Sequence, residues 1–331
     1  MKLTRRYFLM TALGTAACNR PKSSARTKLT VSVGPFHTMS PLYVAYERGY
    51  FREAGFDLDI RPIRSSAEAL PLLAQGVIDL GLFVLTPGIC NLAAKGAKIK
   101  IAAAREYVSP CAGTGLFYGR KDRFTKPFED RSQWHGKRIS TSSKGSIAHF
   151  CFATMMDSMG LKTSDVQLFH LDRAAGVAGL LSGGLDGIAN GFGFPLSLGE
   201  NAALVTVSDV VVTRLLKEFQ YSYILFSEKL AGMDPEIGGA FLAAYLRGSH
   251  EYVKGATPQY LEQWIEENRM DRKEVLGGCR DSFVVDGSIR EGDITKQFQW
   301  FLNDGMVERT VPAEQIVDRR WLEVAHRRSK A

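Results

Sequence analysis

Six short loops of the sequence carry side chains that suit the capture of a small polar solute. Each loop directly follows a predicted strand, and the candidate binding residues are Phe36, His37, Thr38, Ser65, Ser66, Thr86, Ser143, Lys144, Gly145, Ser146, Arg173, Asn190 and Phe192. Several of these loops begin predicted helices, whose free N–H groups and positive dipole end favour an anionic or strongly accepting solute. The two phenylalanines suit a flat ring or an apolar stem.

These residues also have simpler structural interpretations. Ser66 and Ser146 are equally typical of helix N-caps, and a single His37 in a loop is often a solvated bystander. Arg173 is the strongest candidate for an anionic group, because a guanidinium binds a carboxylate or sulfonate with two parallel hydrogen bonds. The neighbouring Asp172 opposes a purely acidic ligand unless it pairs with Arg173.

The sequence lacks the motifs of common enzymes and metal sites. It contains no HExxH, GxSxG or P-loop, and "GTGLFYG" places its last Gly one position too late for GxGxxG. The four cysteines beyond residue 18 are widely spaced, without a CxxC pair: Cys90, Cys111, Cys151 and Cys279. We therefore expect no catalytic residues, no cofactor and no metal, and we expect buried inert thiols, although the spacing leaves disulfide pairing open.

A repeated unit positions the six loops. "LAQGVID" at 73–79 and "LLSGGLD" at 180–186 share Leu, Gly and Asp at a constant offset of 107 residues. The flanks repeat as well: strand, helix, strand, helix, strand over 29–84, and again over 137–191. This order predicts parallel strands with right-handed crossovers. Ligands bind outside the carboxyl ends of such strands, which is why the loops after them are the candidates. His149 and His170 fall in a helix and a strand of the second unit.

Two extended stretches, 113–122 and 221–227, are predicted to cross between the units. We therefore expect an α/β fold of two similar lobes with parallel or mixed sheets, joined by two hinge strands around a ligand cleft. The predicted divisions are 1–28 for an export signal and tether, 29–113 for lobe I, 114–220 for lobe II, and 221–331 for the hinge return and helices that pack on lobe I. The helical spacing of the late aromatics favours a core role for Trp264, Phe298, Trp300 and Phe301.

The first residues predict export from the cytoplasm. Arg5 and Arg6 precede an apolar run, Tyr7 to Ala17, which is far shorter than the about 20 residues of a transmembrane helix. The run ends in small residues before Cys18, which resembles a twin-arginine signal with a lipobox, although Thr15 stands where Leu is usual. Lipidation at Cys18 and simple cleavage both fit. Removing residues 1–17 lowers the net charge from +7 to +4, and no basic stripe predicts nucleic acid as a partner.

The segment "AYERGYFREAGFDLDI" resembles a signature of bacterial solute-binding proteins for nitrate, taurine, alkanesulfonates and thiamine pyrimidine precursors. The matching positions are Ala45, Gly49-Tyr50-Phe51, Gly55, Gly76 and Asp79. "WHGKRISTSSKGSIAH" is similar to the start of the family's second lobe, and the resemblance spans about residues 29–250.

The resemblance implies a type II periplasmic binding protein fold and a monomer that holds one small solute. It also implies an extracytoplasmic location and delivery of the solute to the membrane permease of an ATP-driven (ABC) importer. Two other functions stay open: an enzyme like the pyrimidine synthases of the same fold, and a ligand-sensing partner of a membrane receptor. The synthases carry closely spaced cysteines, whereas Cys111 stands alone in "SPCAGTG".

Overall fold

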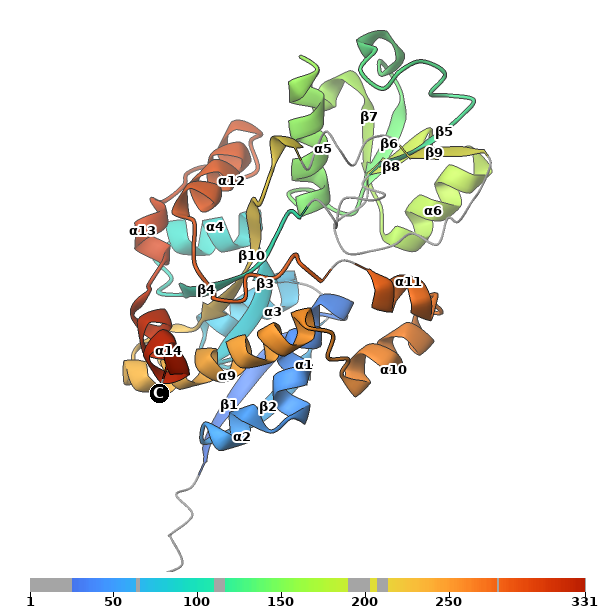
Figure 1. The fold of residues 1–331 in the computed structure, drawn as a ribbon. Coiled ribbons are helices and arrows are strands. Elements are labelled where there is room, and N and C mark those ends of the chain that lie inside the picture. The colour runs from blue at the N-terminus through green and yellow to red at the C-terminus, as the bar shows by residue number, and fades with distance from the viewer. Residues whose placement is uncertain are drawn as a thin grey trace, which may run out of the picture.

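Two α/β lobes, each built on one mixed sheet, make up the protein (Figure 1). The structure is a computed structural model, and it describes residues 26–63, 66–109, 117–189, 203–206, 214–278 and 280–330. The predicted fold class is confirmed. The export segment with Cys18 lies outside the described residues. Within the described part, no helix has the length and apolar character needed to cross a membrane.

The sheet of lobe I has the strand order β2-β1-β3-β10-β4. Its strands are β1 (Thr27–Val33), β2 (Phe56–Pro62), β3 (Leu80–Val84), β4 (Lys100–Tyr107) and β10 (Gln220–Phe226). β1 runs parallel to β2 and β3, while β10 runs antiparallel to both β3 and β4. The carboxyl end of β4 therefore lies at the same edge as those of β1, β2 and β3.

The sheet of lobe II repeats this arrangement, with the order β7-β6-β8-β5-β9. Its strands are β5 (Phe117–Arg120), β6 (Arg138–Thr141), β7 (Gln167–His170), β8 (Gly187–Ala189) and β9 (Leu204–Thr206). β6 is parallel to β7 and β8, and β5 is antiparallel to β8 and β9. In each lobe the antiparallel strand belongs to a segment predicted to cross between lobes, so those segments build the sheets as well as linking them.

The helices that follow the strands of lobe I are α1 (Ser40–Glu47), α2 (Tyr50–Glu53), α3 (Ser66–Ala74) and α4 (Pro87–Ala94), and a short 3-10 turn, η1 (His37–Met39), precedes them. The single helix expected over 40–55 is two helices, because Gly49 adopts a left-handed backbone with φ 80°. A serine directly before Pro41 is typical of an N-cap, but Met39 holds that position, and the Ser40 hydroxyl donates to the carbonyl oxygen of His37 at 2.6 Å.

Lobe II carries α5 (Ile147–Ser158) and α6 (Arg173–Ser182), with short 3-10 turns η3 (Arg131–Gln133) and η4 (Thr163–Asp165). Both α5 and α6 have side-chain N-caps. The Ser146 hydroxyl accepts from the backbone N–H of His149 at 3.2 Å, and the Asp172 carboxylate accepts from that of Ala175 at 2.9 Å. The caps satisfy N–H groups that the first turn of a helix leaves free.

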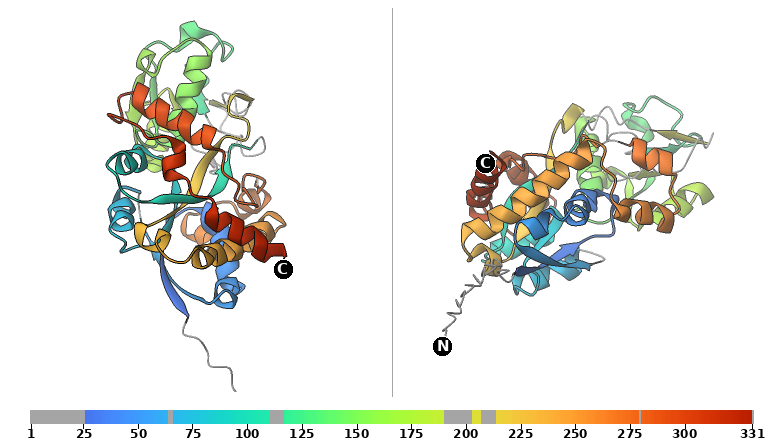
Figure 2. Two further views of the ribbon diagram at one scale, coloured as in Figure 1. Left: turned by 90° about the vertical axis from the view of Figure 1, so that its left-hand side faces the viewer. Right: turned by 60° about the horizontal axis from the view of Figure 1, so that its bottom comes forward.

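The C-terminal third is helical, as expected. Its helices are α8 (Glu228–Ala231), α9 (Pro235–Val253), α10 (Gln259–Glu267), α11 (Arg272–Gly277), α12 (Glu291–Asn303), α13 (Ala313–Ile316) and α14 (Arg320–Lys330). Residues of α9 and α14 belong to a hydrophobic cluster that contains alternate residues of β1, β3 and β10. Residues of α12 and α13 belong to a second cluster, which contains other residues of β3 and β10. Figure 2 shows α9 and α14 on one side of that lobe.

Burial explains the late aromatic residues. Trp264, Phe298 and Phe301 are buried in the hydrophobic clusters of lobe I, as predicted. Trp300 is half-buried and also contacts lobe II: its ring lies 5.1 Å from the ring centroids of both His149 and Phe150 in α5. Helix α12 therefore joins the two lobes, which the prediction of packing on lobe I alone did not include.

Candidate functional site

A buried arginine lies near the carboxyl end of β4, at the edge of lobe I where the candidate loops lie. Arg105 is 1% exposed, and its guanidinium donates to the Thr38 carbonyl at 2.8 Å, to the Ser222 hydroxyl at 2.9 Å and to the Tyr245 hydroxyl at 3.3 Å. These bonds tie the loop after β1 and the hinge strand β10 to β4. Because every nitrogen of the guanidinium donates to the protein, Arg105 fixes the geometry of this edge.

The next residue, Glu106, is a buried carboxylate that the protein satisfies only in part. It is 2% exposed, its Oε2 lies 3.6 Å from Nη1 of Arg105, and its Oε1 has no hydrogen-bond partner in the described part of the chain. Burial raises the pKa of Glu106, while Arg105 and the side chains of Ser222 and Thr38 act in the opposite direction.

Aromatic residues hold the loop after β1 at this edge of lobe I. The Trp264 indole donates to the Pro35 carbonyl and the Tyr260 hydroxyl donates to the Phe36 carbonyl, both at 3.0 Å. The His37 ring lies 5.3 Å from the Trp264 ring, and the Phe36 side chain is 40% exposed. Helix α10 therefore orients the loop that contains the first predicted binding residues, and it leaves the Phe36 ring open to solvent.

In lobe II, a buried histidine follows the Ser143–Ser146 loop. His149 is 2% exposed, and its Nδ1 accepts from the Gly145 backbone N–H at 3.2 Å. Burial lowers the pKa of His149 to about 4, with smaller contributions from His170 and Lys144. The ring is thus neutral, and because Nδ1 accepts, the proton is on Nε2. That nitrogen is buried without a hydrogen-bond partner in the described part of the chain.

The two lobes meet where the Thr86 loop faces the Ser143–Ser146 loop. A Cβ added at Gly145 would lie 2.4 Å from Cγ of Pro87, and Gly145 has φ 75°. Only glycine fits this approach without displacing a neighbour. The Thr86 hydroxyl, one residue from the contact, is also buried and has no partner within the described residues.

The structure thus brings several predicted binding residues together. Phe36, His37 and Thr38 lie at the carboxyl edge of lobe I, and the Thr86 loop lies opposite the loop of Ser143, Lys144, Gly145 and Ser146, in which Lys144 is exposed. Ser66 and Arg173 are the first residues of α3 and α6. Ser65, Asn190 and Phe192 lie outside the described residues.

Sequence reasoning missed Arg105 and Glu106. The prediction considered three strands in each unit and no strand over 100–107, so the fourth carboxyl end of lobe I went unexamined. The available signal was a charged pair in an otherwise apolar extended stretch, "KIAAAREY". Charged residues are almost never fully buried unless they are paired, which makes such a pair in a strand worth testing as a site.

Cysteine and metal chemistry receive no support from the described residues. Among them, no group of His, Cys, Asp and Glu could hold a metal ion. Cys90 and Cys151 are buried free thiols, as expected, and burial raises the pKa of Cys90 to about 11. Cys111 and Cys279 lie outside the described residues.

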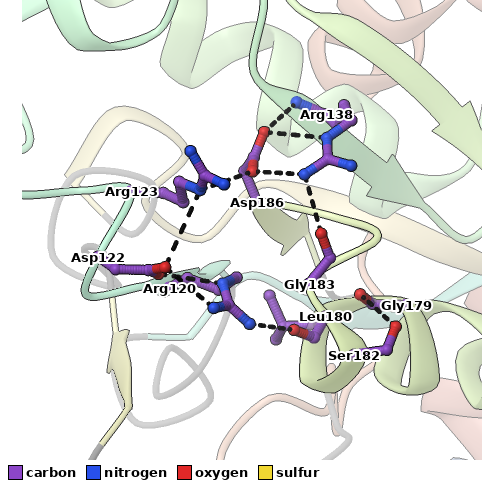
Figure 3. Close-up of polar contacts among 9 residues, drawn as sticks. All are labelled: Arg120, Asp122, Arg123, Arg138, Gly179, Leu180, Ser182, Gly183 and Asp186. Carbon is purple, nitrogen blue, oxygen red and sulfur yellow. Dashed lines mark hydrogen bonds and ion pairs between the residues drawn. The ribbon is translucent and has the colours of Figure 1, made fainter.

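The repeated Leu-x-x-Gly-x-apolar-Asp motif lies at the opposite end of each lobe from these loops. Asp79 accepts from the backbone N–H of Thr30 at 2.8 Å, and Asp186 accepts from that of Arg138 at 2.8 Å. Figure 3 shows Asp186 between the side chains of Arg138 and Arg123. Each Asp connects the start of the third strand of its repeat unit, β3 or β8, to the first, β1 or β6, so the motif has a structural role in both lobes.

Comparison with known proteins identifies the class to which this architecture belongs. The family model described as NMT1/THI5 like matches residues 37–256, and the chain belongs to that family. A search of curated protein sequences finds no match.

The solved structures with a similar fold include periplasmic binding proteins. The aliphatic sulphonate binding protein SsuA from Escherichia coli has a TM-score of 0.70 at 16% identity, over 88% of this chain and 92% of that one. The nitrate-binding protein NrtA from Synechocystis PCC 6803 has a TM-score of 0.61 at 12% identity, over 91% and 89%. The alkanesulfonate-binding SsuA from Xanthomonas axonopodis pv. citri, bound to MOPS, has a TM-score of 0.67 at 16% identity, over 89% and 100%. At these identities the likeness establishes the fold.

Proposed function

We propose that the protein is an extracytoplasmic solute-binding protein that captures one small polar solute between its lobes and delivers it to an ABC importer. The observation that carries this proposal is a set of buried polar atoms that have no protein partner among the described residues and lie near the carboxyl edges of the two sheets: Thr86 Oγ1 and Glu106 Oε1 in lobe I and His149 Nε2 in lobe II. Buried polar groups are almost always hydrogen-bonded, so atoms of this kind at a cleft suit a polar ligand. The family and the structural neighbours support the same reading.

We further propose the predicted loops as the binding residues and about 29–113 and 114–220 as the lobes. The test is a thermal-shift screen of the mature chain against sulfonates, nitrate, aromatic acids, amino acids and nitrogen heterocycles, followed by isothermal titration of each hit. One solute should bind per chain. Absence of binding across the panel would contradict the proposal.

The proposed protein performs no chemistry of its own. The structural neighbours named above are binding proteins, which supports this part of the proposal. Each solute that binds should be recovered unchanged after prolonged incubation, as followed by mass spectrometry. Conversion of a bound solute would instead support an enzyme related to the pyrimidine synthases.

Membrane attachment through Cys18 is proposed from the export segment. Replacing Cys18 by Ser should move the protein from the membrane fraction to the soluble extracytoplasmic fraction, and replacing both Arg5 and Arg6 by Lys should retain it in the cytoplasm. Fractionation and immunoblotting read out both variants. A Cys18→Ser protein that stays on the membrane would exclude the lipid anchor.

A further inference from the structure

Glu106 is a carboxylate whose two oxygens have different surroundings. Oε2 lies beside the Arg105 guanidinium at 3.6 Å, and the side chains of Ser222 and Thr38 also favour the charged form, whereas Oε1 is buried and has no hydrogen-bond partner in the described part of the chain. Leaving a buried carboxylate oxygen without a donor destabilises the protein unless something else supplies the donor. Whether a solute can supply that donor depends on where Glu106 lies in its strand.

Glu106 lies at the ligand edge of lobe I, close to the second lobe. It is the penultimate residue of β4, whose carboxyl end points the same way as those of β1 and β3. Tyr221, the second residue of the hinge strand β10, packs in the hydrophobic cluster of lobe II together with Cys151 of α5. The carboxylate therefore lies at the carboxyl edge of the lobe I sheet, on the strand that pairs with the hinge strand β10.

The Arg105 guanidinium beside Glu106 already donates hydrogen bonds from all its nitrogens to the protein, so it has none to offer a solute. Arg105 uses its three nitrogens on Thr38, Ser222 and Tyr245, all of which belong to lobe I or to the hinge. An anionic group that reached this edge would meet the lone pairs of Oε1 rather than a free guanidinium. A solute with an N–H group would meet an acceptor that needs a donor.

The facing lobe offers the opposite polarity. Nδ1 of His149 accepts from the Gly145 N–H, so the other ring nitrogen carries a proton, and it has no acceptor within the described residues. Lobe I thus holds a buried acceptor without a donor, and lobe II holds a buried donor without an acceptor, both within the described residues.

We infer that Glu106 is the specificity-determining residue of the cleft, and that its Oε1 accepts a hydrogen bond from an amino or ring N–H group of the solute. This inference rests on the proposed function. It assigns the site to nitrogen-bearing solutes that also carry an acceptor, such as amino sulfonates or aminated heterocycles, and it excludes small anions without a donor. Sites built to bond a substrate N–H or O–H discriminate strongly against analogues that lack it.

Matched pairs of solutes test the inference directly. Taurine and ethanesulfonate differ by one ammonium group, and 4-aminopyrimidine and pyrimidine differ by one amino group. Isothermal titration of the full mature protein should show the aminated member of at least one pair binding at least about tenfold more tightly than its partner, in line with the loss of one hydrogen bond to a charged group. In Glu106→Gln that preference should fall to less than about threefold, because the charge that favours an N–H donor is gone.

Two further variants separate recognition from folding. Glu251→Gln removes a carboxylate of α9 that bonds Tyr50, away from the cleft, and should leave the preference intact. Glu106→Asp keeps the charge but withdraws it by one methylene, so it should weaken the aminated solute selectively. If Glu106→Gln does not fold by circular dichroism, the aspartate variant carries the test.

The outcomes distinguish this inference from the proposed function. Equal affinity of both members of every pair that binds, or tight binding of nitrate or ethanesulfonate alone, would overturn the role of Glu106 while leaving solute capture intact. An unchanged preference in the folded glutamine variant would do the same. Failure of every solute in the wider panel would instead contradict the proposed function itself.

Discussion

The two lobes share their scaffold and differ at the edges that face each other. Asp79 and Asp186 make equivalent bonds to the first strand of their sheets, and Gly76 and Gly183 both adopt a left-handed backbone before them, with φ 70° and φ 81°. At the cleft, lobe I buries an Arg–Glu pair, whereas lobe II buries a neutral histidine. The two copies of the repeated unit thus share the Asp and Gly residues that join their strands, and they differ in the buried charged or polar residues at the carboxyl edge of each sheet.

The largest effect is expected from breaking the buried pair of lobe I. Arg105→Met removes the only cation beside Glu106 in the described structure and frees Thr38 and Ser222 from their bonds. Leaving one partner of a buried pair uncompensated typically costs about 3–5 kcal/mol. The free energy of unfolding from urea titration should fall by that order. A loss below about 1 kcal/mol would show that the pair does not organise this edge of lobe I.

The two structural aspartates should come next, with a larger loss in lobe I. Asp79→Ala and Asp186→Ala each leave a backbone N–H without its acceptor, at about 1–3 kcal/mol. Asp79 is 3% exposed and Asp186 is 6% exposed. Asp79 also bonds Lys229 of α8, a helix outside the repeat unit, whereas the charged partners of Asp186, Arg123 and Arg138, belong to lobe II itself. Chemical unfolding of both variants checks this order. A larger loss for Asp186→Ala would contradict it.

Acid should destabilise the lobes through different residues. Burial alone would raise the pKa of Asp186, but the hydrogen bonds and charge of Arg138 outweigh it and hold the pKa below its ordinary value. A carboxyl with a lowered folded-state pKa stabilises the protein above its unfolded pKa of about 3.9, and that contribution is lost as pH falls further. Asp186→Asn should therefore flatten the pH dependence of the melting temperature below about pH 4.

His149 should act in a higher pH range. Its pKa is lowered from an ordinary 6.5 to about 4 in the folded protein. Between these pH values the histidine is therefore protonated in the unfolded chain and neutral in the folded one. Stability is fully present above about pH 6.5 and declines as pH falls from there toward 4. His149→Phe should reduce the slope of stability between these values. An unchanged slope would show that His149 is protonated in the folded protein.

The contact between Gly145 of lobe II and Pro87 of lobe I should have the smallest effect on stability, and changing it should weaken solute binding. Gly145→Ala places a Cβ against Pro87 and strains a left-handed backbone, whereas Gly136→Ala strains a comparable backbone, φ 70°, where nothing lies within 4 Å. Both should lose about 1 kcal/mol of stability. Only Gly145→Ala should also weaken solute binding, as measured by titration. Equal affinity of the two variants would contradict a role of the contact in capture.

The two α/β lobes could be predicted from the sequence because the repeat and the alternation of strands and helices are written in short stretches of residues. The repeated Leu-x-x-Gly-x-apolar-Asp motif and the N-cap at Ser146 follow from residue type and spacing. The buried pair at the carboxyl edge of lobe I did not follow. Arg105 and Glu106 pair with Ser222, more than a hundred residues away, through a strand that the repeat does not contain. Trp300 likewise reaches lobe II only because α12 returns across both lobes.

Gly49 illustrates a smaller local limit. A single glycine between two apolar helical stretches fits one kinked helix or two short ones, and its left-handed conformation decides for two. Ser40 shows the same limit, since a serine before a proline fits both the N-cap and the first helical turn.

The central claim, capture of a solute between moving lobes, is tested most directly by the distance between them. Lys95 in lobe I and Glu129 in lobe II are exposed and accept cysteine substitutions for spin labels. Cys90 and Cys151 are buried, and Cys18, Cys111 and Cys279 are replaced by Ser so that only the two new thiols are labelled. Pulsed electron spin resonance should give a shorter or narrower distance distribution on addition of a solute that titration shows to bind. An identical distribution with and without the bound solute would contradict the account.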